Sequence, residues 1–589
     1  MKKVIQIVAI YLIAIVALTS CRHKTEDLIE EAIRDTIGKP TGKITQKDYD
    51  SITSLDLKNK YITDLSGIEH LTNLTELDLS YTFIRDVTPL SKLKNLKVLY
   101  FKSNFLRDIT PLGNLTNLTE LSLGTNGIRD LTPLSNLTNL TYLSLWNNEI
   151  EDLTPLSNLT NLKTLDLCRN QISDITPLSN LTNLTKLYLA NCMCPPYNQI
   201  SDITPLSNLT NLKELWLGGN TISDFTPLSH LTNLTLLSIW GSGMTDISAL
   251  SHLTNLTELY LMGNKINDLA PVSNLTNLTL LDLGGTGISD ISYLSNLTNL
   301  KDLNLKNNTI NVLPTLSNLT SLTELNLSNN QITDITSLSN LTNLRDLDLT
   351  ENTISDLTPL SHLTNLKELD LSKNIKIDLT TLKNLTNLTL LSLWENEIKD
   401  ITPLSHLTSL TVLNLSNNQI SDLTPLSNLA NLTYLSLRNN EIEDLTPLSN
   451  LTNLTDLTLS YNQIKDLTPL SNLTNLTELD LSYNQISDLT PLSNLTNLTE
   501  LDLSYNQISS ITPISNLVNL KYLDLSQNNI SDISILRSMV DNGSFTSGLS
   551  DHNNYHLILG KNSIDITKGS DAYKMIMYLK RKGVSIDIY

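Results

Sequence analysis

The chain has 589 residues, 5% of them aromatic, and its 60 Asp and Glu residues outnumber its 40 Lys and Arg residues, giving a formal charge of −20. A surface with this excess of carboxylates repels phosphate backbones, and the sequence shows no basic stripe of the kind that nucleic-acid binding needs. DNA and RNA are therefore not expected as partners.

The first 21 residues differ from the rest of the chain. Lys2 and Lys3 precede a nearly uninterrupted apolar run from Val4 to Leu18. About 15 apolar residues are short for a membrane-spanning helix and typical of a secretory signal peptide. The following Leu-Thr-Ser-Cys resembles the lipobox of bacterial lipoproteins, which implies cleavage before Cys21 and lipidation of its thiol. The alternatives are an ordinary signal peptide with an incidental cysteine, or an uncleaved anchor.

We therefore expect residues 1–21 to be a lipoprotein signal peptide. The mature chain would be exported and lipid-anchored to the bacterial cell envelope, on the outer face of a membrane. No later segment of the sequence approaches the length of a spanning helix, so the membrane would be contacted only through the anchor.

Residues 22–48 are predicted to form a helical cap. The segment from Thr25 to Ile37 has helical periodicity, and Gly38 followed by Pro40 marks its end. Such a cap is needed where a stack of repeats would otherwise expose its core.

From residue 49 the chain repeats. The unit from Leu495 to Asn516 is well formed, and its starting leucine recurs every 22 residues apart from one insertion. Counting an imperfect first unit, residues 49–538 contain 22 units. The pattern matches the Leu-x-x-Leu-x-Leu-x-x-Asn-x-Leu motif of leucine-rich repeats. A single short strand cannot bury its apolar side alone, so successive coils are expected to stack around a continuous core.

The unit predicts an α/β solenoid, a leucine-rich-repeat horseshoe with a parallel β-sheet on the concave face and short helical turns on the convex face. Around Leu501, apolar and polar residues alternate as in a strand. Asn506 is predicted to be buried, with its amide satisfying backbone groups where the chain leaves the strand. Thr490 is predicted to cap a helical turn that begins with Pro491. The core of this layer is predicted to comprise Leu495, Leu498, Leu501, Leu503, Ile508, Ile511 and Ile514.

Residues 539–589 are predicted to form a degenerate repeat and a C-terminal cap. Leu557 and Asn562 echo the repeat motif after an insertion. Asp571 to Lys582 has the pattern of an amphipathic helix that ends at Gly583, and the last residues read as a strand.

The 22-residue unit, with its Asp-Leu-Thr-Pro-Leu-Ser-Asn-Leu-Thr-Asn-Leu passage, resembles the internalin-type class of bacterial leucine-rich repeats. The helical N-terminal cap is similar to the cap common in that group, so the resemblance spans Thr25 to Tyr589. It implies a surface protein that holds a protein ligand, often on a host cell, against its concave strand face.

The concave face can be located within the repeat. The fifth, seventh and ninth residues after each starting leucine point outward from the predicted sheet. All four tryptophans occupy these positions, together with several tyrosines. The predicted ligand-binding residues are Tyr100, Tyr142, Trp146, Tyr188, Trp216, Leu236, Trp240, Tyr260, Met262 and Trp394. The glycines alongside them are predicted to leave room for the close approach of a partner; they are Gly124, Gly218, Gly219, Gly241, Gly263, Gly284 and Gly285.

Exposed Trp and Tyr clusters are typical of interface hot spots, so the favoured partner is a protein ligand bound by a monomer. The same rings could stack against the sugars of a glycan or envelope polymer, which is the alternative function. A third interpretation is structural, because aromatic residues also pack on one another across strands.

Other features favour structural roles. Asp86 and its equivalents recur once per coil and are predicted to cap the adjacent turn. The unit that starts at Leu181 carries six extra residues, where Cys192 and Cys194 could form a disulfide with Cys168. We find no nucleophile with a base, no metal cluster and no phosphate-binding loop, so neither enzymatic activity nor a cofactor or metal is predicted.

Overall fold

The computed structural model describes residues 25–191, 197–313, 316–374, 376–545 and 556–588. The chain forms two compact units, one ending at Leu278 and the other beginning at Thr279. The predicted signal peptide, with Cys21, lies outside the described residues, as do Cys192 and Cys194 and with them the suggested disulfide.

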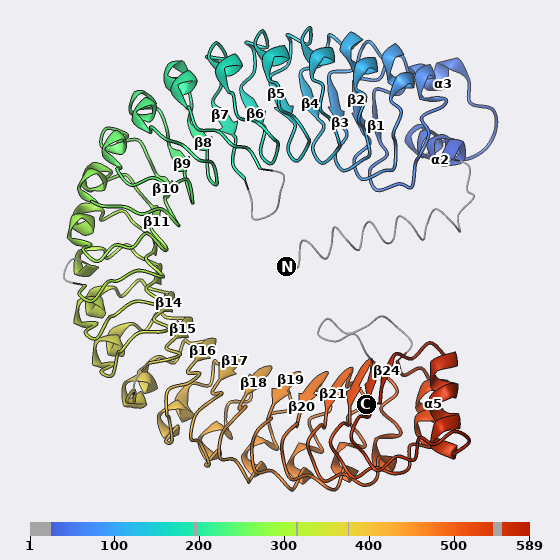
Figure 1. Ribbon diagram of the computed structural model, residues 1–589, viewed down its shortest axis with the longest axis vertical. Helices are drawn as coiled ribbons and strands as arrows, with labels where there is room; N and C mark the ends of the chain where they lie inside the picture. Colours follow the sequence, from blue (N-terminus) through green and yellow to red (C-terminus); the bar gives the residue numbers. More distant parts are fainter. Residues whose placement is uncertain (1–24, 192–196, 314–315, 375, 546–555, 589) are drawn as a thin grey trace. The chain divides into compact units, whose positions relative to one another are not determined.

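The first unit is a stack of coils, coloured blue to green in Figure 1. Within it, the strands follow the inner side of the arc and the helical turns follow the outer side (Figure 1). Each strand pairs in parallel with the next, and equivalent positions of successive coils are in register, as with Leu99 and Leu121. The described strands are β1 (Ser54–Asp56), β2 (Glu76–Asp78), β3 (Val98–Tyr100), β4 (Glu120–Ser122), β5 (Tyr142–Ser144), β6 (Thr164–Asp166), β7 (Lys186–Tyr188), β8 (Glu214–Trp216), β9 (Leu236–Ser238) and β10 (Glu258–Tyr260).

The outer side of the first unit is made of 3-10 turns. They are η1 (Ile68–His70), η2 (Thr88–Lys92), η3 (Thr110–Asn114), η4 (Thr132–Leu134), η5 (Thr154–Leu156), η6 (Thr176–Leu178), η7 (Thr204–Asn208), η8 (Thr226–His230), η9 (Ser248–Leu250) and η10 (Ala270–Asn274).

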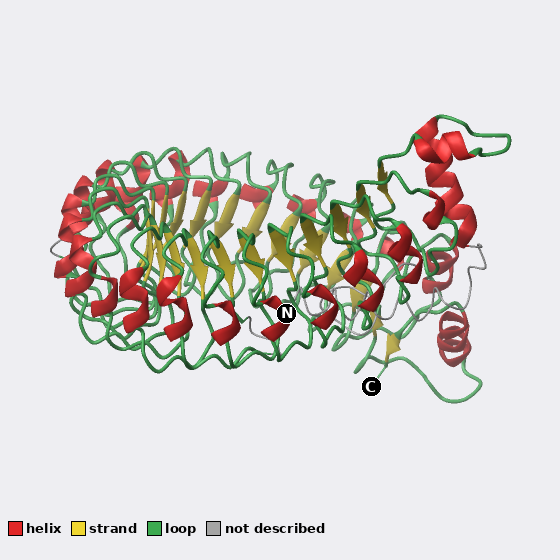
Figure 2. Cartoon of the chain, turned by 90° about the horizontal axis from the view of Figure 1, so that it is seen from above, coloured by secondary structure: helices red, strands yellow, loops and turns green. Residues whose placement is uncertain are grey.

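The second unit repeats this architecture, with parallel pairing from one strand to the next. Its described strands are β11 (Leu280–Asp282), β12 (Asp302–Asn304), β13 (Glu324–Asn326), β14 (Asp346–Asp348), β15 (Glu368–Asp370), β16 (Leu390–Ser392), β17 (Val412–Asn414), β18 (Tyr434–Ser436), β19 (Asp456–Thr458), β20 (Glu478–Asp480), β21 (Glu500–Asp502), β22 (Tyr522–Asp524), β23 (Leu557–Ile558) and β24 (Ile586–Asp587). Strands and helical turns alternate along the chain (Figure 2).

The helical turns of the second unit also lie on the outer side of its arc (Figure 1). They are η11 (Ser292–Asn296), η12 (Leu316–Asn318), η13 (Thr336–Asn340), η14 (Thr358–His362), η15 (Leu379–Asn384), η16 (Thr402–His406), η17 (Thr424–Leu426), η18 (Thr446–Leu448), η19 (Thr468–Leu470), η20 (Thr490–Leu492) and η21 (Thr512–Ile514), followed by the α-helices α4 (Leu536–Asp541) and α5 (Asp571–Arg581).

The predicted solenoid, its parallel sheet and its leucine core are confirmed. In the layer around β21, all seven predicted core residues are at most 1% exposed. Each such leucine or isoleucine contributes roughly 1.5–3 kcal/mol by leaving water, although the entropy of ordering the chain offsets most of that gain.

The repeat asparagine has the predicted role where it is present, as Asn506 shows. Asn506 Nδ2 donates to the carbonyls of Leu481 and Leu503 at 2.9 and 3.1 Å. Its Oδ1 accepts the backbone N–H of Ile486 at 3.0 Å. One buried amide therefore satisfies backbone groups in its own coil and in the preceding coil, which ties the two together.

The helical turns differ from the prediction in one respect. Pro491 lies in the first turn of η20 as expected, but Thr490 makes no cap; the residue at the cap position is Leu489, whose side chain cannot accept a hydrogen bond. Asp488 caps the turn instead, because its Oδ1 accepts the backbone N–H of Thr490 at 2.9 Å. Hydrogen bonds from Thr490 hold the pKa of Asp488 below its usual value. The capping role predicted for this aspartate ladder is confirmed.

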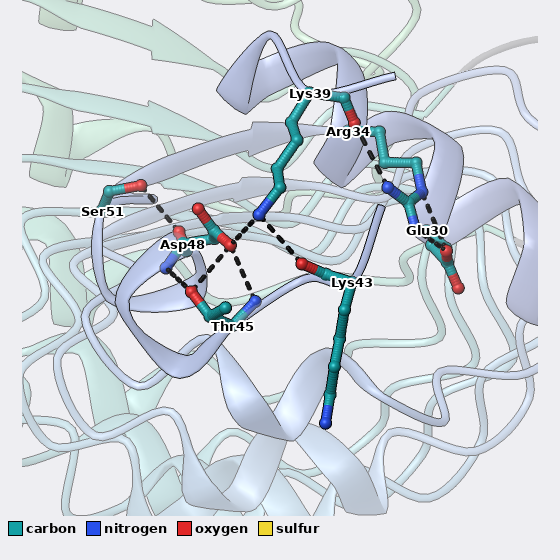
Figure 3. Close-up of polar contacts among 7 residues, drawn as sticks. All are labelled: Glu30, Arg34, Lys39, Lys43, Thr45, Asp48 and Ser51. Atoms are coloured by element: carbon teal, nitrogen blue, oxygen red, sulfur yellow. Dashed lines mark hydrogen bonds and ion pairs between the residues drawn. The ribbon is translucent and has the colours of Figure 1, made fainter. Parts of the chain in front are cut away.

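The N-terminal cap contains the predicted helix, α2 (Thr25–Ile37), and a second, unpredicted helix, α3 (Gln46–Asp50). A capping box starts α3: Asp48 Oδ2 accepts the backbone N–H of Thr45 at 2.7 Å, and the Thr45 side chain accepts from Asp48. Lys39 Nζ lies 2.8 Å from the same carboxylate oxygen (Figure 3). The hydrogen bond from Lys39 is the largest of the effects that hold the pKa of Asp48 far below its usual range.

The C-terminal cap is the predicted helix and strand. Helix α5 starts at the cap residue Ser570, whose Oγ accepts the backbone N–H of Tyr573 at 3.0 Å. Strand β24 then pairs with β23 and extends the sheet of the second unit. The last coil is thus covered by an element of different type, as a solenoid requires.

Candidate ligand-binding face

The structure places nine of the ten predicted ligand-binding residues on the strand face of the first unit. They belong to β3, β5, β7, β8, β9 and β10 or to the residues just after these strands. On each strand the alternate side chains, such as Leu99 and Leu187, are fully buried on the core side. The tenth residue, Trp394, follows β16 in the second unit, where Lys373 Nζ lies 4.8 Å from its ring centroid.

An aromatic cluster occupies the middle of this face. Tyr188 and Trp216 meet edge to face, with ring centroids 6.1 Å apart and planes at 64°. Trp216 also contacts Tyr260, at 6.4 Å between centroids, although these residues lie on β8 and β10. Between them β9 carries Ser238, in register with both and only 2% exposed. The small serine lets the two rings meet above it, so three aromatic side chains form one continuous surface.

The neighbouring Trp240 packs back onto the preceding coil. Its indole lies over Gly218, where a β-carbon would collide with the ring, and beside Gly219, where a β-carbon would be 3.1 Å from the ring. The prediction that these glycines leave room for a ligand is therefore wrong at Gly218, because that space is filled by the protein's own tryptophan. The absence of a side chain at Gly218 instead lets the indole pack onto the preceding coil.

Tyrosine hydroxyls on this face pair with glutamates. Tyr100 Oη donates to Glu120 Oε2 at 2.8 Å, and Tyr188 Oη donates to Glu214 Oε2 at 2.8 Å. Burial, followed by the hydrogen bond to Glu120, raises the pKa of Tyr100 to about 12. These two glutamates were not predicted from the sequence. The available signal was a Glu at the fifth position of the coil that follows a Tyr at the seventh position.

Glu214 also receives an ion pair, with Lys186 Nζ 2.6 Å from its Oε1. A third tyrosine, Tyr260, donates to Glu258 of its own strand at 3.0 Å. These bonds orient the rings and place carboxylates beside them, at the starts of β4, β8 and β10.

The rings differ in how much surface they offer. Trp146 is 38% exposed, with the Arg169 guanidinium 5.8 Å from its ring centroid. The other predicted residues of the first unit are half-buried. The Nε1 of Trp216 is buried and has no hydrogen-bond partner among the described residues. Packing alone therefore positions this indole, and its carbon edge is the part that can contact a ligand.

Other candidate chemistry is limited. Within the described ranges, no group of His, Cys, Asp and Glu side chains is arranged to hold a metal ion. Among these residues, too, no helix combines the length and apolar character needed to cross a bilayer. A surface depression of about 540 Å³ lies away from the aromatic cluster, along Tyr461, Tyr483 and Tyr505 of the second unit.

Comparison with solved structures gives three informative neighbours. Internalin inlF from Listeria monocytogenes is 39% identical, with a TM-score of 0.48; the match covers 58% of this chain and 93% of that one. The plant peptide hormone receptor RGFR1, in complex with RGF2, is 24% identical with a TM-score of 0.51 and coverages of 82% and 95%. The ectodomain of the receptor kinase GASSHO1/SCHENGEN3 from Arabidopsis thaliana, in complex with CASPARIAN STRIP INTEGRITY FACTOR 2, is 23% identical with a TM-score of 0.51 and coverages of 87% and 79%. None of the curated proteins compared matches this sequence.

The family model described as Leucine Rich repeats (2 copies) matches well over half of the chain. The matched residues are 50–92, 94–136, 138–180, 160–195, 182–230, 232–274, 298–340, 320–362, 342–386, 386–428, 408–450, 430–472, 452–494 and 496–538. This family is generally non-catalytic and typically binds proteins. The repeat, its stacked coils and this match together show that the chain belongs to the leucine-rich-repeat family.

Proposed function

We propose that this chain is a non-catalytic binding protein that holds a protein ligand on the strand face of its first unit. The observation that carries the proposal is the continuous aromatic surface of Tyr188, Trp216 and Tyr260, with Trp146 exposed on the same face. Buried Trp and Tyr anchors are each worth about 2 kcal/mol or more in protein interfaces. Solved structures with this fold include plant receptors in complex with RGF2 and with CASPARIAN STRIP INTEGRITY FACTOR 2.

The test uses a triple variant, Trp146→Ser, Trp216→Ser and Trp240→Ser. Serine is the residue that other coils carry at these positions, as at Ser238 and Ser504, so the substitutions suit the strand. The affinity of immobilised residues 22–589 for proteins captured from the native cell surface should fall about 700-fold, since two lost hot spots amount to roughly 4 kcal/mol if no new contacts replace them.

The matched control is Arg438→Ser, which removes another large side chain from the same coil position in the second unit. It should leave capture unchanged. Undiminished capture by the triple variant would refute the proposal that this strand face binds the ligand. If the chain bound a glycan array and captured no protein, the ligand would be a glycan, and the strand face would remain the proposed binding site.

For localisation we propose export and lipid anchoring at Cys21 to the bacterial cell envelope. Support comes from the Leu-Thr-Ser-Cys motif after an apolar segment of signal-peptide length. Cells fed a labelled fatty acid should incorporate it into the wild-type chain and into Cys168→Ser, but not into Cys21→Ser. Label retained in Cys21→Ser would contradict the proposal.

A further inference from the structure

A second aromatic surface lies on the flank of the first three coils, away from the strand positions. Tyr61, Phe83 and Phe105 stack on one another, with ring centroids 5.7 and 6.1 Å apart and planes within 10° and 20° of parallel. Tyr61 is 63% exposed, and the two phenylalanines are half-buried. The equivalent residue in later coils is often Gln, as at Gln171 and Gln507, so the coil itself does not need an aromatic ring here.

Two arginines border this stack. The Arg85 guanidinium lies 5.4 Å from the ring centroid of Phe105. Arg107 lies against Gly127 of the next coil, within 3.3 Å of where a β-carbon would stand. Neither arginine forms an ion pair with any residue that the structure describes. We call Tyr61, Phe83, Phe105, Arg85 and Arg107 the aromatic–arginine strip.

The carboxylates that follow these arginines in sequence are engaged elsewhere. Asp86 Oδ1 accepts the backbone N–H of Thr88 at 2.8 Å, and Asp108 Oδ1 accepts that of Thr110 at 2.9 Å. Asp86 and Asp108 keep their negative charges, but they do not bind the guanidinium groups, whose N–H donors remain available to an external anion. At physiological salt the Debye length is about 8 Å, so the acidic residues of distant coils do not cancel the guanidinium charges.

A second pair of the same kind lies in these coils. Lys58 Nζ is 5.8 Å from the ring centroid of Tyr81, and Tyr81 is 47% exposed. Exposed aromatic rings beside cations that form no ion pair can bind a membrane, whose surface is anionic and whose interior is apolar. Side chains of both kinds are enriched where proteins contact the headgroup region of a bilayer.

We propose that the aromatic–arginine strip docks on the phosphate-bearing headgroups of an anionic membrane. The choice of a membrane rests on the proposed lipid anchor. Cys21 precedes Thr25 by four residues, a length of chain that spans at most about 14 Å between their Cα atoms, so an anchor at Cys21 would be close to the start of helix α2. Helix α2 packs against β1, as seen in Figure 1. An anchored chain would therefore keep its first coils close to the membrane surface.

The strip starts in the coil of β1 and ends two coils later. Strands stack about 4.8 Å apart, so it extends roughly 10 Å from that first coil. Docking would supply a second membrane contact beside the anchor and would restrict how the strand face is presented to its ligand.

The experiment measures co-sedimentation of residues 22–589, without lipid, with vesicles of phosphatidylglycerol and phosphatidylcholine or of phosphatidylcholine alone. One variant carries Tyr61→Gln, Phe83→Gln and Phe105→Gln, and a second carries Arg85→Ser and Arg107→Ser. The replacements are residues that another coil has at these positions, Gln171 and Ser173, and circular dichroism checks that both variants keep the fold.

Wild type should bind the phosphatidylglycerol vesicles and bind phosphatidylcholine weakly. Each arginine near an anionic surface contributes about a fivefold gain in affinity, so the arginine variant should bind roughly 25-fold more weakly. The aromatic variant should also lose binding. Equal binding by wild type and both variants, or no binding of wild type to anionic vesicles, would overturn the proposal.

The tryptophan triple variant of the strand face should bind vesicles as wild type does. Conversely, the strip variants should still capture the ligand in solution. The two experiments therefore test the membrane contact and the ligand-binding face independently of each other. Neither measurement depends on lipidation of Cys21.

Discussion

Trp240 fills the space above Gly218 of the preceding coil, so that a β-carbon on Gly218 would lie 2.2 Å from Trp240 Nε1. No real contact is that short, and the indole would have to move. Gly218 does not have a positive φ angle, so alanine is compatible with its backbone. Gly218→Ala should therefore displace Trp240, change the near-ultraviolet circular dichroism and weaken ligand capture, while the far-ultraviolet spectrum stays unchanged.

Gly124→Ala is the control for this substitution. The nearest atom to a β-carbon there is Trp146 O at 3.3 Å, a contact that a small shift can relieve. A near-ultraviolet spectrum changed equally by both variants, or by neither, would show that Gly218 does not set the position of the indole.

Asn170 should be more important for stability than its exposed neighbour Asn161. Asn170 is fully buried; its Nδ2 donates to Leu145 O and Leu167 O at 3.0 and 3.1 Å, and its Oδ1 accepts from Ile150 N. Asn170→Ala leaves buried backbone groups unpaired, at a cost of about 1–3 kcal/mol each. Urea denaturation followed by circular dichroism should show a clearly lower midpoint.

Asn161 makes one hydrogen bond, from Nδ2 to Thr138 O at 2.8 Å, at an exposed position where water can replace it. Asn161→Ala should therefore cost at most about 1 kcal/mol. Similar losses for the two variants would mean that burial does not decide the contribution of these amides.

The tyrosine stack of the second unit predicts which of two substitutions lowers the free energy of unfolding more. Tyr483 lies between Tyr461 and Tyr505, with ring centroids at 4.0 and 3.9 Å. Each aromatic pair contributes about 0.5–1.5 kcal/mol beyond area burial. Tyr483→Ala breaks two pairs and Tyr505→Ala breaks one, so the central substitution should lower the free energy of unfolding by the larger amount. Denaturant titration of both variants checks the order, and a larger loss at Tyr505 would contradict it.

Asp502 should make stability depend on pH in the neutral range. Burial, followed by the charge of Asp524, raises the pKa of Asp502 from 3.8 to about 7. Between these values the folded state binds more protons than the unfolded state, so the free energy of unfolding falls as pH rises. Asp502→Asn should match wild type near pH 4 and exceed it above pH 7 by roughly 1–3 kcal/mol. Asparagine already occupies the equivalent position at Asn326 and Asn414.

Asp488 provides a control of opposite sign, because hydrogen bonds from Thr490 lower its pKa. Its contribution is present above the unfolded pKa and is lost as pH falls through the folded value. Asp488→Asn should therefore reduce stability at neutral pH and have little effect in strong acid. Urea midpoints measured from pH 3 to pH 8 test both variants. Parallel pH profiles for wild type and Asp502→Asn would contradict the assignment.

Much of the fold follows from hydrophobic spacing. Helix α2 was predicted because its apolar residues have helical periodicity and Gly38 can take the positive φ angle, 64°, that ends it. Helix α3 was missed because its five residues depend on the pairing of Thr45, Asp48 and Lys39 and include no buried residue. The prediction that Thr490 caps the turn was wrong because the 3-10 turn begins at Thr490 itself, directly after Leu489. The carboxylate of Asp488 is therefore close enough to accept the backbone N–H of Thr490.

The sequence allowed us to predict which residues lie on the candidate ligand-binding face, but not how their side chains pack to form its surface. Strand alternation places Trp146, Trp216 and Trp240 on one face, and the structure has them there. Whether an indole stands free or lies on its neighbour depends on small residues one coil away, such as Gly218 and Ser238. Those residues lie 22 positions away in the sequence, so their effect emerges only when the coils are stacked.

The insertion after β7 shows how such a chain can change without refolding. Asn191 Nδ2 donates to Asn198 O and Gly219 O at 2.8 and 2.7 Å, and Asn198 N donates back to Asn191 Oδ1 at 2.7 Å. Asn198 then takes up the carbonyls of Leu167 and Leu189, as the asparagine of an uninterrupted coil does. The two amides close the neck of the insertion, so its length is uncoupled from the register of the strands. A change in the length of this segment is therefore expected to leave the layers of leucines on either side as they are.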